Sequence, residues 1–109
     1  MCPAFEHPET IIQTEPMVLG YFTRPGCGVC SALLPKVERL LIRYPTVRLV
    51  QVDVQRWPRL AGQHLVFAVP TLILFYRGRE WHRFSRWVSL TELEKALARM
   101  VENLPETDE

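Results

Sequence analysis

The sequence predicts an α/β fold in which a central mixed sheet of four to five strands is flanked by helices. An almost continuous apolar run over 17–23 is typical of a strand that is buried on both faces. Apolar residues then recur at helical spacing over 28–44, and a second apolar strand follows at 47–54. Because a helix connects them, these two strands are expected to run parallel. A hairpin further along the chain adds antiparallel strands and makes the sheet mixed.

A short helix is expected before the first strand. Pro8 suits the first position of a helix, because the N–H group at that position has no partner within the helix, and an acidic residue follows it. Ile11 and Ile12 would then face inward, and Pro16 ends the helix. Residues 1–16 are therefore predicted to be an N-terminal lead-in that contains this helix.

The helix predicted over 28–44 contains one proline and is followed by another. Pro35 should kink the helix, and Pro45 should end it. The apolar residues that recur at helical spacing are Val29, Leu33, Leu34, Val37, Leu40, Leu41 and Tyr44.

The second half of the chain begins with a short helix at 58–63 and continues with strands at 71–77 and 80–86. Gly78 lies between the two strands, where a hairpin turn is expected. The charged residues of the later strand are typical of a sheet edge.

A closing helix is predicted over 90–101, with Ser89 or Thr91 as its N-cap. The folded domain is then expected over 17–103, and 104–109 form an acidic tail. One face of the closing helix is lined by Leu90, Leu93, Leu97 and Val101.

The composition is that of an ordinary globular domain. A chain of 109 residues, 48% hydrophobic and 23% charged, is long enough for one core. Its net charge of +1 gives no field that would attract nucleic acid or a membrane surface. The N-terminal residues lack the basic and apolar regions of a signal peptide, and no apolar run approaches the roughly 18 residues of a membrane span. We expect a cytoplasmic monomer that binds neither nucleic acid nor membrane.

Cys27 and Cys30 form a C-x-x-C motif between the first strand and the following helix. In the cytoplasm such a pair is typical of redox chemistry, because structural disulfides are rare there. Cys27 falls at a helix N-terminus, where unpaired N–H groups and the positive end of the helix dipole stabilise a thiolate. We therefore expect Cys27 to attack a disulfide and Cys30 to resolve the mixed disulfide. Gly26 and Gly28 leave Cys27 open to a bulky substrate.

Two other interpretations of the cysteine pair remain. In the first, the pair is buried and inert. In the second, it is part of a zinc site, which needs four ligands. The only residues able to join such a site are Cys2, His7, His64 and His82. No nucleotide, flavin or metal motif is visible, so the dithiol itself is the expected redox centre and no cofactor is expected.

The chain resembles the thioredoxin superfamily, and more narrowly its small bacterial members, over roughly residues 17–102. The resemblance rests on an apolar strand that ends in C-G-V-C, on Pro35 five residues after the second cysteine, and on a hairpin at 75–80. It rests also on Val69 and Pro70 at the start of a strand. It implies a thioredoxin-like fold with a cis Val69–Pro70 peptide, which would lie beside the disulfide and help to hold substrate backbone. The first strand of the family is expected to be shortened or absent.

Several positions depart from the family pattern. Members usually have Trp before the first cysteine, where this chain has Gly26, and Gly-Pro between the cysteines, where it has Gly-Val. They carry a buried Asp, which assists proton transfer at the second thiol, at the position of Tyr21. The small glycine that lines the family's substrate groove aligns with Arg86, and the adjacent Trp87 is the best candidate for substrate contact.

A structural role is the favoured interpretation of the other aromatic residues, and also of Trp87 unless it contacts substrate. Tyr21 is predicted to lie in the core, because a phenol with a reference pKa of ~10 is a weak base at neutral pH. Core or edge packing is the favoured interpretation of all three tryptophans, Trp57, Trp81 and Trp87. His64 and His82 are expected to be surface or packing residues.

These residues predict a thiol–disulfide oxidoreductase whose two cysteines are catalytic and which reduces protein disulfides. Electrons would come from a thioredoxin reductase or a low-molecular-weight thiol. Substrate contact is expected at Gly26, Val69, Pro70 and Trp87. Two alternatives stay open: an oxidant, isomerase or glutathione-linked dithiol enzyme, and a peptide- or partner-binding module with little turnover.

Overall fold

A computed structural model describes residues 7–103, which form four strands and four helices. The predicted acidic tail at 104–109 and Cys2 lie outside the described residues. In chain order the elements are α1 (Pro8–Thr14), β1 (Met17–Thr23), α2 (Gly28–Leu41), β2 (Arg48–Asp53), α3 (Pro58–Gln63), β3 (Thr71–Tyr76), β4 (Arg79–Ser85) and α4 (Leu90–Asn103).

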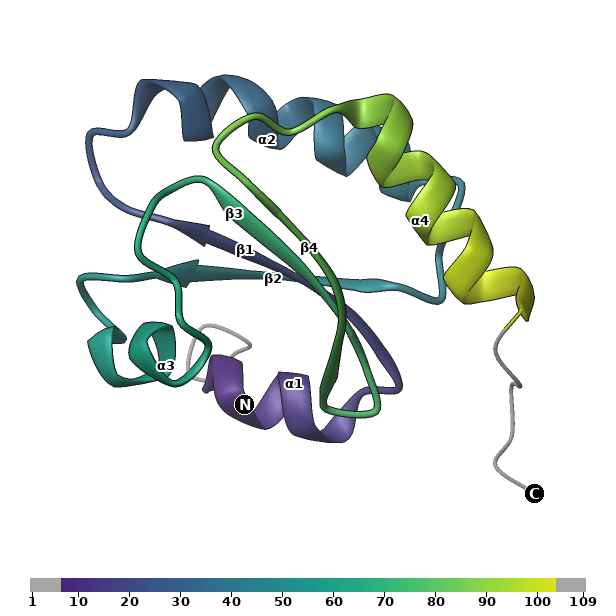
Figure 1. Ribbon diagram of the computed structural model, residues 1–109, viewed down its shortest axis with the longest axis horizontal. Helices are drawn as coiled ribbons and strands as arrows, with labels where there is room; N and C mark the ends of the chain where they lie inside the picture. The colour runs from purple at the N-terminus through teal and green to yellow at the C-terminus, as the bar shows by residue number, and fades with distance from the viewer. Residues whose placement is uncertain (1–6, 104–109) are drawn as a thin grey trace.

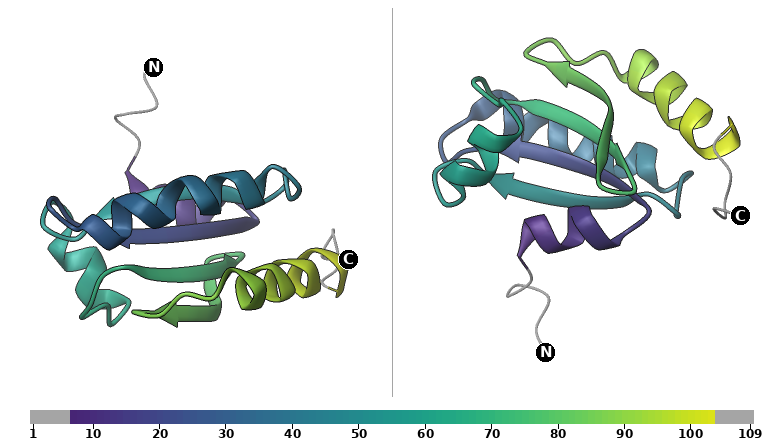
Figure 2. Two further views of the ribbon diagram at one scale, coloured as in Figure 1. Left: turned by 90° about the horizontal axis from the view of Figure 1, so that it is seen from above. Right: turned by 60° about the horizontal axis from the view of Figure 1, so that its bottom comes forward.

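The strands form one mixed sheet in the order β2-β1-β3-β4, which confirms the predicted architecture. The strands β1 and β2 pair in parallel, while β3 pairs antiparallel with both β1 and β4. The right-hand view of Figure 2 shows β1 and β2 side by side, with β4 at the opposite border of the sheet. The edge position of β4 agrees with the charges that the sequence places on it.

Helices cover both faces of the sheet. The helices α2 and α4 lie on one side of it, and α1 and α3 lie on the other (Figure 1). The division follows from the alternation of side chains along β1, where Leu19 and Tyr21 face one layer and Val18 and Phe22 face the other. Each face of the sheet therefore has its own hydrophobic core.

The first core contains Cys30, the second cysteine of the C-x-x-C motif. It is built from the strands, α2 and α4, and its buried residues include Tyr21, Cys30, Leu72, Leu93 and Leu97. The second core lies under α1 and α3 and includes the predicted inward residues Ile11 and Ile12. No helix in the range 7–103 is both long and apolar enough to cross a membrane.

The helix α2 differs from its prediction at both ends. It stops at Leu41, three residues early, because the backbone N–H of Ile42 turns back to the carbonyls of Arg39 and Leu40. At the other end, Val29 was expected on the buried face but is 63% exposed. The reason is that the first turn of α2 projects at the end of the sheet, where no other element covers Val29.

The N-cap of α4 is Ser89, one of the two predicted candidates. Its side-chain oxygen accepts a hydrogen bond of 3.2 Å from the backbone N–H of Glu92. Replacing Ser89 by alanine should lower the free energy of unfolding by about 1 kcal/mol, because one N–H group of the first turn loses its partner. Urea denaturation measures this loss. The matched control is Thr91→Ala, which removes a hydroxyl from the exposed first turn, and an equal loss in both variants would contradict the assignment.

Candidate active site

The C-x-x-C motif lies where β1 ends and α2 begins. After β1 the chain turns, and the backbone N–H of Cys27 donates to the carbonyl of Arg24 at 3.3 Å. Gly26 occupies the turn at φ +80°, a left-handed conformation that glycine adopts without penalty. A Cβ atom built at Gly26 or Gly28 would meet no atom within 4 Å outside the adjacent stretch of chain. Both flanks of Cys27 are therefore open, as the sequence predicts.

Cys27 and Cys30 are joined by a disulfide, with their Cα atoms 5.3 Å apart. Cys27 is the N-cap of α2, and its Sγ accepts a hydrogen bond of 3.2 Å from the backbone N–H of Cys30. The first turn of α2 contains no acidic residue that would repel an anion. The same N–H group and the helix dipole are thus available to a thiolate on Cys27 after reduction.

The two sulfurs differ in their access to solvent. Cys27 is half-buried, whereas Cys30 is only 2% exposed and belongs to the core formed with α2 and α4. A bulky disulfide can therefore approach Cys27, while Cys30 is shielded from solvent and bonded to Cys27. This asymmetry is what a two-step thiol–disulfide exchange requires.

The segment before β3 lies against this site. Its Val69–Pro70 peptide is cis, as the family resemblance implies. Val69 is half-buried and packs, like Cys27, against the core that contains Cys30. The carbonyl of Pro70 accepts a hydrogen bond of 3.1 Å from the backbone N–H of Arg86. That bond brings the chain that follows β4, and with it Trp87, to the same end of the sheet.

Trp87 is 91% exposed, so the expectation that it packs in the core or at an edge is wrong. The physical reason is its position after the end of β4, where its side chain points away from the core against which the next residue, Val88, packs. Trp57 and Trp81 are partly buried and pack against the two cores, as predicted. A large exposed aromatic side chain beside Pro70 is available for contact with another molecule.

Phe67 is a second exposed aromatic residue, which the sequence analysis did not single out. It is 85% exposed and lies in the segment between α3 and the cis peptide. A hollow of about 340 Å³ adjoins it, lined by Arg24, Val54, Val66, Phe67, Ala68 and Val69. The sequence shows that Phe67 lies just before Val69-Pro70, but it does not show that the Phe67 side chain is exposed.

Tyr21 lies beneath the second cysteine. Its ring is 1% exposed, and its hydroxyl donates a hydrogen bond of 2.6 Å to the backbone carbonyl of Cys30. Burial raises the pKa of Tyr21 to about 12. The phenol is therefore neutral at physiological pH and cannot take a proton from Cys30, in contrast to the carboxylate that the resemblance leads one to expect here.

The histidines take part in packing. The ring of His64 meets Phe75 at a centroid distance of 5.0 Å, and that of His82 meets Phe84 at 4.7 Å. Within residues 7–103, no group of three His, Cys, Asp or Glu side chains is arranged to hold a metal ion. The zinc interpretation therefore finds no ligand set in the described part of the chain.

Comparisons with known proteins agree with this geometry. The family model described as thioredoxin matches residues 4–99. A thioredoxin-like protein of Bacillus subtilis, YdfQ, is 36% identical over 92 residues, which cover 84% of this chain and 82% of that protein. The thioredoxin of Chlamydia trachomatis is 42% identical over 67 residues, covering 62% of this chain and 66% of its own length.

Solved structures give the same result. Thioredoxin 1 of Thermosipho africanus superposes with a TM-score of 0.72 at 33% identity, covering 78% of this chain and 94% of that one. A thioredoxin of Fasciola hepatica superposes with a TM-score of 0.74 at 31% identity, covering 84% of this chain and 88% of its own. The chain is therefore similar in fold to these thioredoxins over most of its length.

Proposed function

We propose, from the premise that the chain belongs to the thioredoxin family and is a thiol–disulfide oxidoreductase, that it reduces protein disulfides. In this proposal Cys27 is the attacking thiol and Cys30 the resolving thiol. The unequal burial of the two cysteines carries the assignment, because Cys27 is half-buried and Cys30 is 2% exposed. The substrate disulfide meets Cys27 first.

The first step forms a mixed disulfide. The Cys27 thiolate, stabilised at the N-terminus of α2, attacks one sulfur of the substrate disulfide. A bond forms between Cys27 Sγ and that sulfur, the substrate S–S bond breaks, and the other substrate sulfur leaves as a thiolate that takes a proton from water.

The second step releases the substrate. Cys30 loses its proton and attacks Cys27 Sγ, which re-forms the intramolecular disulfide and expels the second substrate thiolate. The substrate has gained two electrons and the protein has lost two. A thioredoxin reductase or a low-molecular-weight thiol then returns two electrons to the Cys27–Cys30 pair.

Water accepts the proton of Cys30 in this scheme. The Tyr21 hydroxyl points to the Cys30 carbonyl, and its pKa of about 12 keeps the phenol protonated at neutral pH. The residue that replaces the family's buried Asp therefore holds the backbone of Cys30 in place and leaves its thiol without a carboxylate base.

Substrate backbone is proposed to lie across Gly26, Val69 and Pro70, with Trp87 at one side. The open space around Gly26, the half-burial of Val69 beside the cysteines, and the exposure of Trp87 support this arrangement. Phe67 is added to the residues expected from the sequence, because it is exposed on the segment that carries Val69.

The proposed partners and setting follow from the chemistry. Thioredoxins need no cofactor beyond the redox-active dithiol, and we propose the same for this chain. The partners are disulfide-containing proteins and an electron donor in the cytoplasm, where the thiol pool keeps proteins reduced. A monomer is sufficient, because both cysteines and the proposed contact residues come from one chain.

An equilibrium titration in glutathione redox buffers tests the direction of the reaction. The Cys27–Cys30 pair should titrate as a two-electron couple close to about −270 mV, the potential typical of thioredoxin. Thiol alkylation followed by mass measurement gives the reduced fraction at each ratio. A clearly less negative couple would contradict the reductase and favour an oxidant, isomerase or glutathione-linked enzyme. The absence of an intramolecular couple would contradict every enzymatic interpretation.

A further inference from the structure

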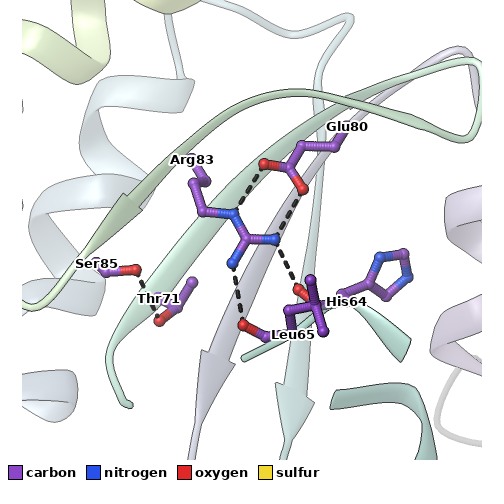
Figure 3. A network of polar contacts seen from close by, with 6 residues as sticks. All are labelled: His64, Leu65, Thr71, Glu80, Arg83 and Ser85. Carbon is purple, nitrogen blue, oxygen red and sulfur yellow. Dashed lines mark hydrogen bonds and ion pairs between the residues drawn. The ribbon is translucent and has the colours of Figure 1, made fainter. Parts of the chain in front are cut away.

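Arg83 on β4 joins two segments that are far apart in the sequence (Figure 3). Its Nε and Nη2 atoms donate to the carboxylate of Glu80 at 2.8 and 2.7 Å. The same guanidinium donates to the carbonyl of His64 at 2.6 Å and to that of Leu65 at 3.2 Å. One side chain thus ties the edge strand to the chain that follows α3.

The acceptor segment has an unusual backbone. Leu65 has φ +56°, a left-handed conformation that a leucine adopts only where its surroundings hold it. The backbone N–H groups of Leu65 and Val66 donate back into α3, to Gly62 at 3.1 Å and Ala61 at 2.9 Å. Those bonds hold the N–H groups of Leu65 and Val66, while Arg83 holds the carbonyls of His64 and Leu65.

Glu80 keeps the guanidinium oriented. The two-atom contact between Glu80 and Arg83 restricts the planar fork to one orientation, with its remaining N–H groups aimed at the two carbonyls. The hydrogen bond from Arg83 lowers the pKa of Glu80 below its usual range, so the carboxylate is charged at neutral pH. A lysine in place of Arg83 would have no such fork.

The other end of the same segment is held by Thr71 at the start of β3 and by Arg86, the residue after β4. Thr71 Oγ1 donates to the carbonyl of Ala68 at 2.6 Å and lies 3.5 Å from the hydroxyl of Ser85. The N–H of Arg86 donates to the carbonyl of Pro70 at 3.1 Å. Chain 66–70 is therefore held at both ends: Arg83 binds the carbonyls just before it, and Thr71 and Arg86 bind the carbonyls of Ala68 and Pro70.

We propose that Arg83 is a positioning residue for substrate binding, which sets the place of chain 66–70 by holding the carbonyls of His64 and Leu65. Arg83 touches neither cysteine in this assignment and acts through the segment that carries Phe67 and Val69. The inference rests on the proposed function, because the segment matters for turnover only if it contacts substrate.

The test compares a protein disulfide with a small one. Arg83→Met keeps most of the side-chain volume and removes every donor. With dithiothreitol as electron donor, kcat/KM for insulin disulfides should fall by about ten- to a hundredfold, mainly through KM. The rate with hydroxyethyl disulfide should stay within about twofold, because that compound has no peptide backbone to lie against chain 66–70 and its attack uses Cys27 alone.

Two matched controls separate positioning from loss of stability. Arg79→Met removes an exposed arginine from the same strand, and Ser89→Ala weakens the fold at α4. Neither should change the ratio of the insulin rate to the hydroxyethyl disulfide rate. If Arg83→Met leaves this ratio unchanged, or if Ser89→Ala changes it equally, the proposal is overturned.

Amide hydrogen exchange measures the positioning itself. The amides of 66–69 should exchange faster in Arg83→Met than in Arg79→Met, while those of β1 stay equally protected. Equal protection of 66–69 in the two variants would overturn the role of Arg83 even if the proposed function holds. A wild-type protein that reduces hydroxyethyl disulfide but never insulin would contradict the proposed function, and the role of Arg83 in substrate binding with it.

Discussion

Replacing Cys30 by serine is expected to trap the protein on its substrate as a mixed disulfide through Cys27. The first exchange step needs only the half-buried thiol of Cys27, whereas release needs the fully buried thiol of Cys30. Replacing Cys27 by serine should instead give no adduct, because a serine hydroxyl cannot form a disulfide and Cys30 is only 2% exposed. Turnover of insulin should fall to the uncatalysed rate in both variants.

Mass measurement after acid quenching distinguishes these outcomes. One substrate chain per Cys30→Ser molecule is expected, released by dithiothreitol. Cys2→Ser is the matched control, because it removes a thiol outside the proposed pair and should leave turnover unchanged. An adduct on Cys27→Ser through Cys30 would show that the roles are reversed. Substrate binding without turnover in the wild type would favour the partner-binding module.

Replacing Tyr21 should produce the largest loss of stability at the site. Tyr21→Ala is expected to lower the free energy of unfolding by about 3–5 kcal/mol, since it removes a fully buried aromatic ring and leaves a cavity. Tyr21→Phe keeps the ring and loses only the hydrogen bond to the Cys30 carbonyl, at a cost of about 1 kcal/mol. Urea denaturation of the oxidised proteins measures both values.

The same pair of variants tests the assigned role of the hydroxyl. Tyr21→Phe should keep insulin turnover near the wild-type value at neutral pH, because a phenol with a pKa of about 12 does not serve as the base for Cys30. A loss of turnover that Tyr21→Phe shares with Cys30→Ser would contradict this assignment. Equal stabilities of Tyr21→Phe and wild type would contradict the hydrogen bond.

The pH dependence of this difference has a definite sign. The folded state holds the Tyr21 proton up to a pKa of about 12, whereas an unfolded tyrosine loses it at ~10. The unfolded state therefore binds fewer protons between these values, and the stability that Tyr21 contributes falls as pH rises through them. The advantage of the wild type over Tyr21→Phe should be complete below ~10 and decline above it.

The order of elements and the place of the cysteine pair were predictable from the sequence. The apolar run at 17–23 is β1, the helix α2 begins at Gly28 within the motif, and the charged strand after Gly78 lies at the sheet edge. These features are encoded locally, in hydrophobic periodicity and in the turn residues beside it. The position of the cysteine pair was predictable for the same reason, because C-x-x-C is a contiguous motif.

The exposure of individual side chains was less predictable. Val29 matched the helical pattern and Trp87 belongs to a residue type that usually packs, yet both face solvent. Phe67 belongs to no periodic pattern that indicates its environment, and its side chain is 85% exposed. Periodicity reports which face of an element is apolar, but burial depends on whether another element covers that point, and within residues 7–103 the side chains of Val29, Phe67 and Trp87 are left largely uncovered.

By itself, then, the sequence determined the layers of this protein, the parallel pairing of β1 with β2, and a dithiol at a helix N-terminus. Only the tertiary structure decided that Cys30 is buried in the core, that the Tyr21 hydroxyl meets the carbonyl of Cys30, and that Arg83 holds the carbonyls of two residues before β3. The physical reason is that backbone carbonyls are present at every residue. Nothing in the sequence marks the ones that a distant side chain will reach once the strands have paired.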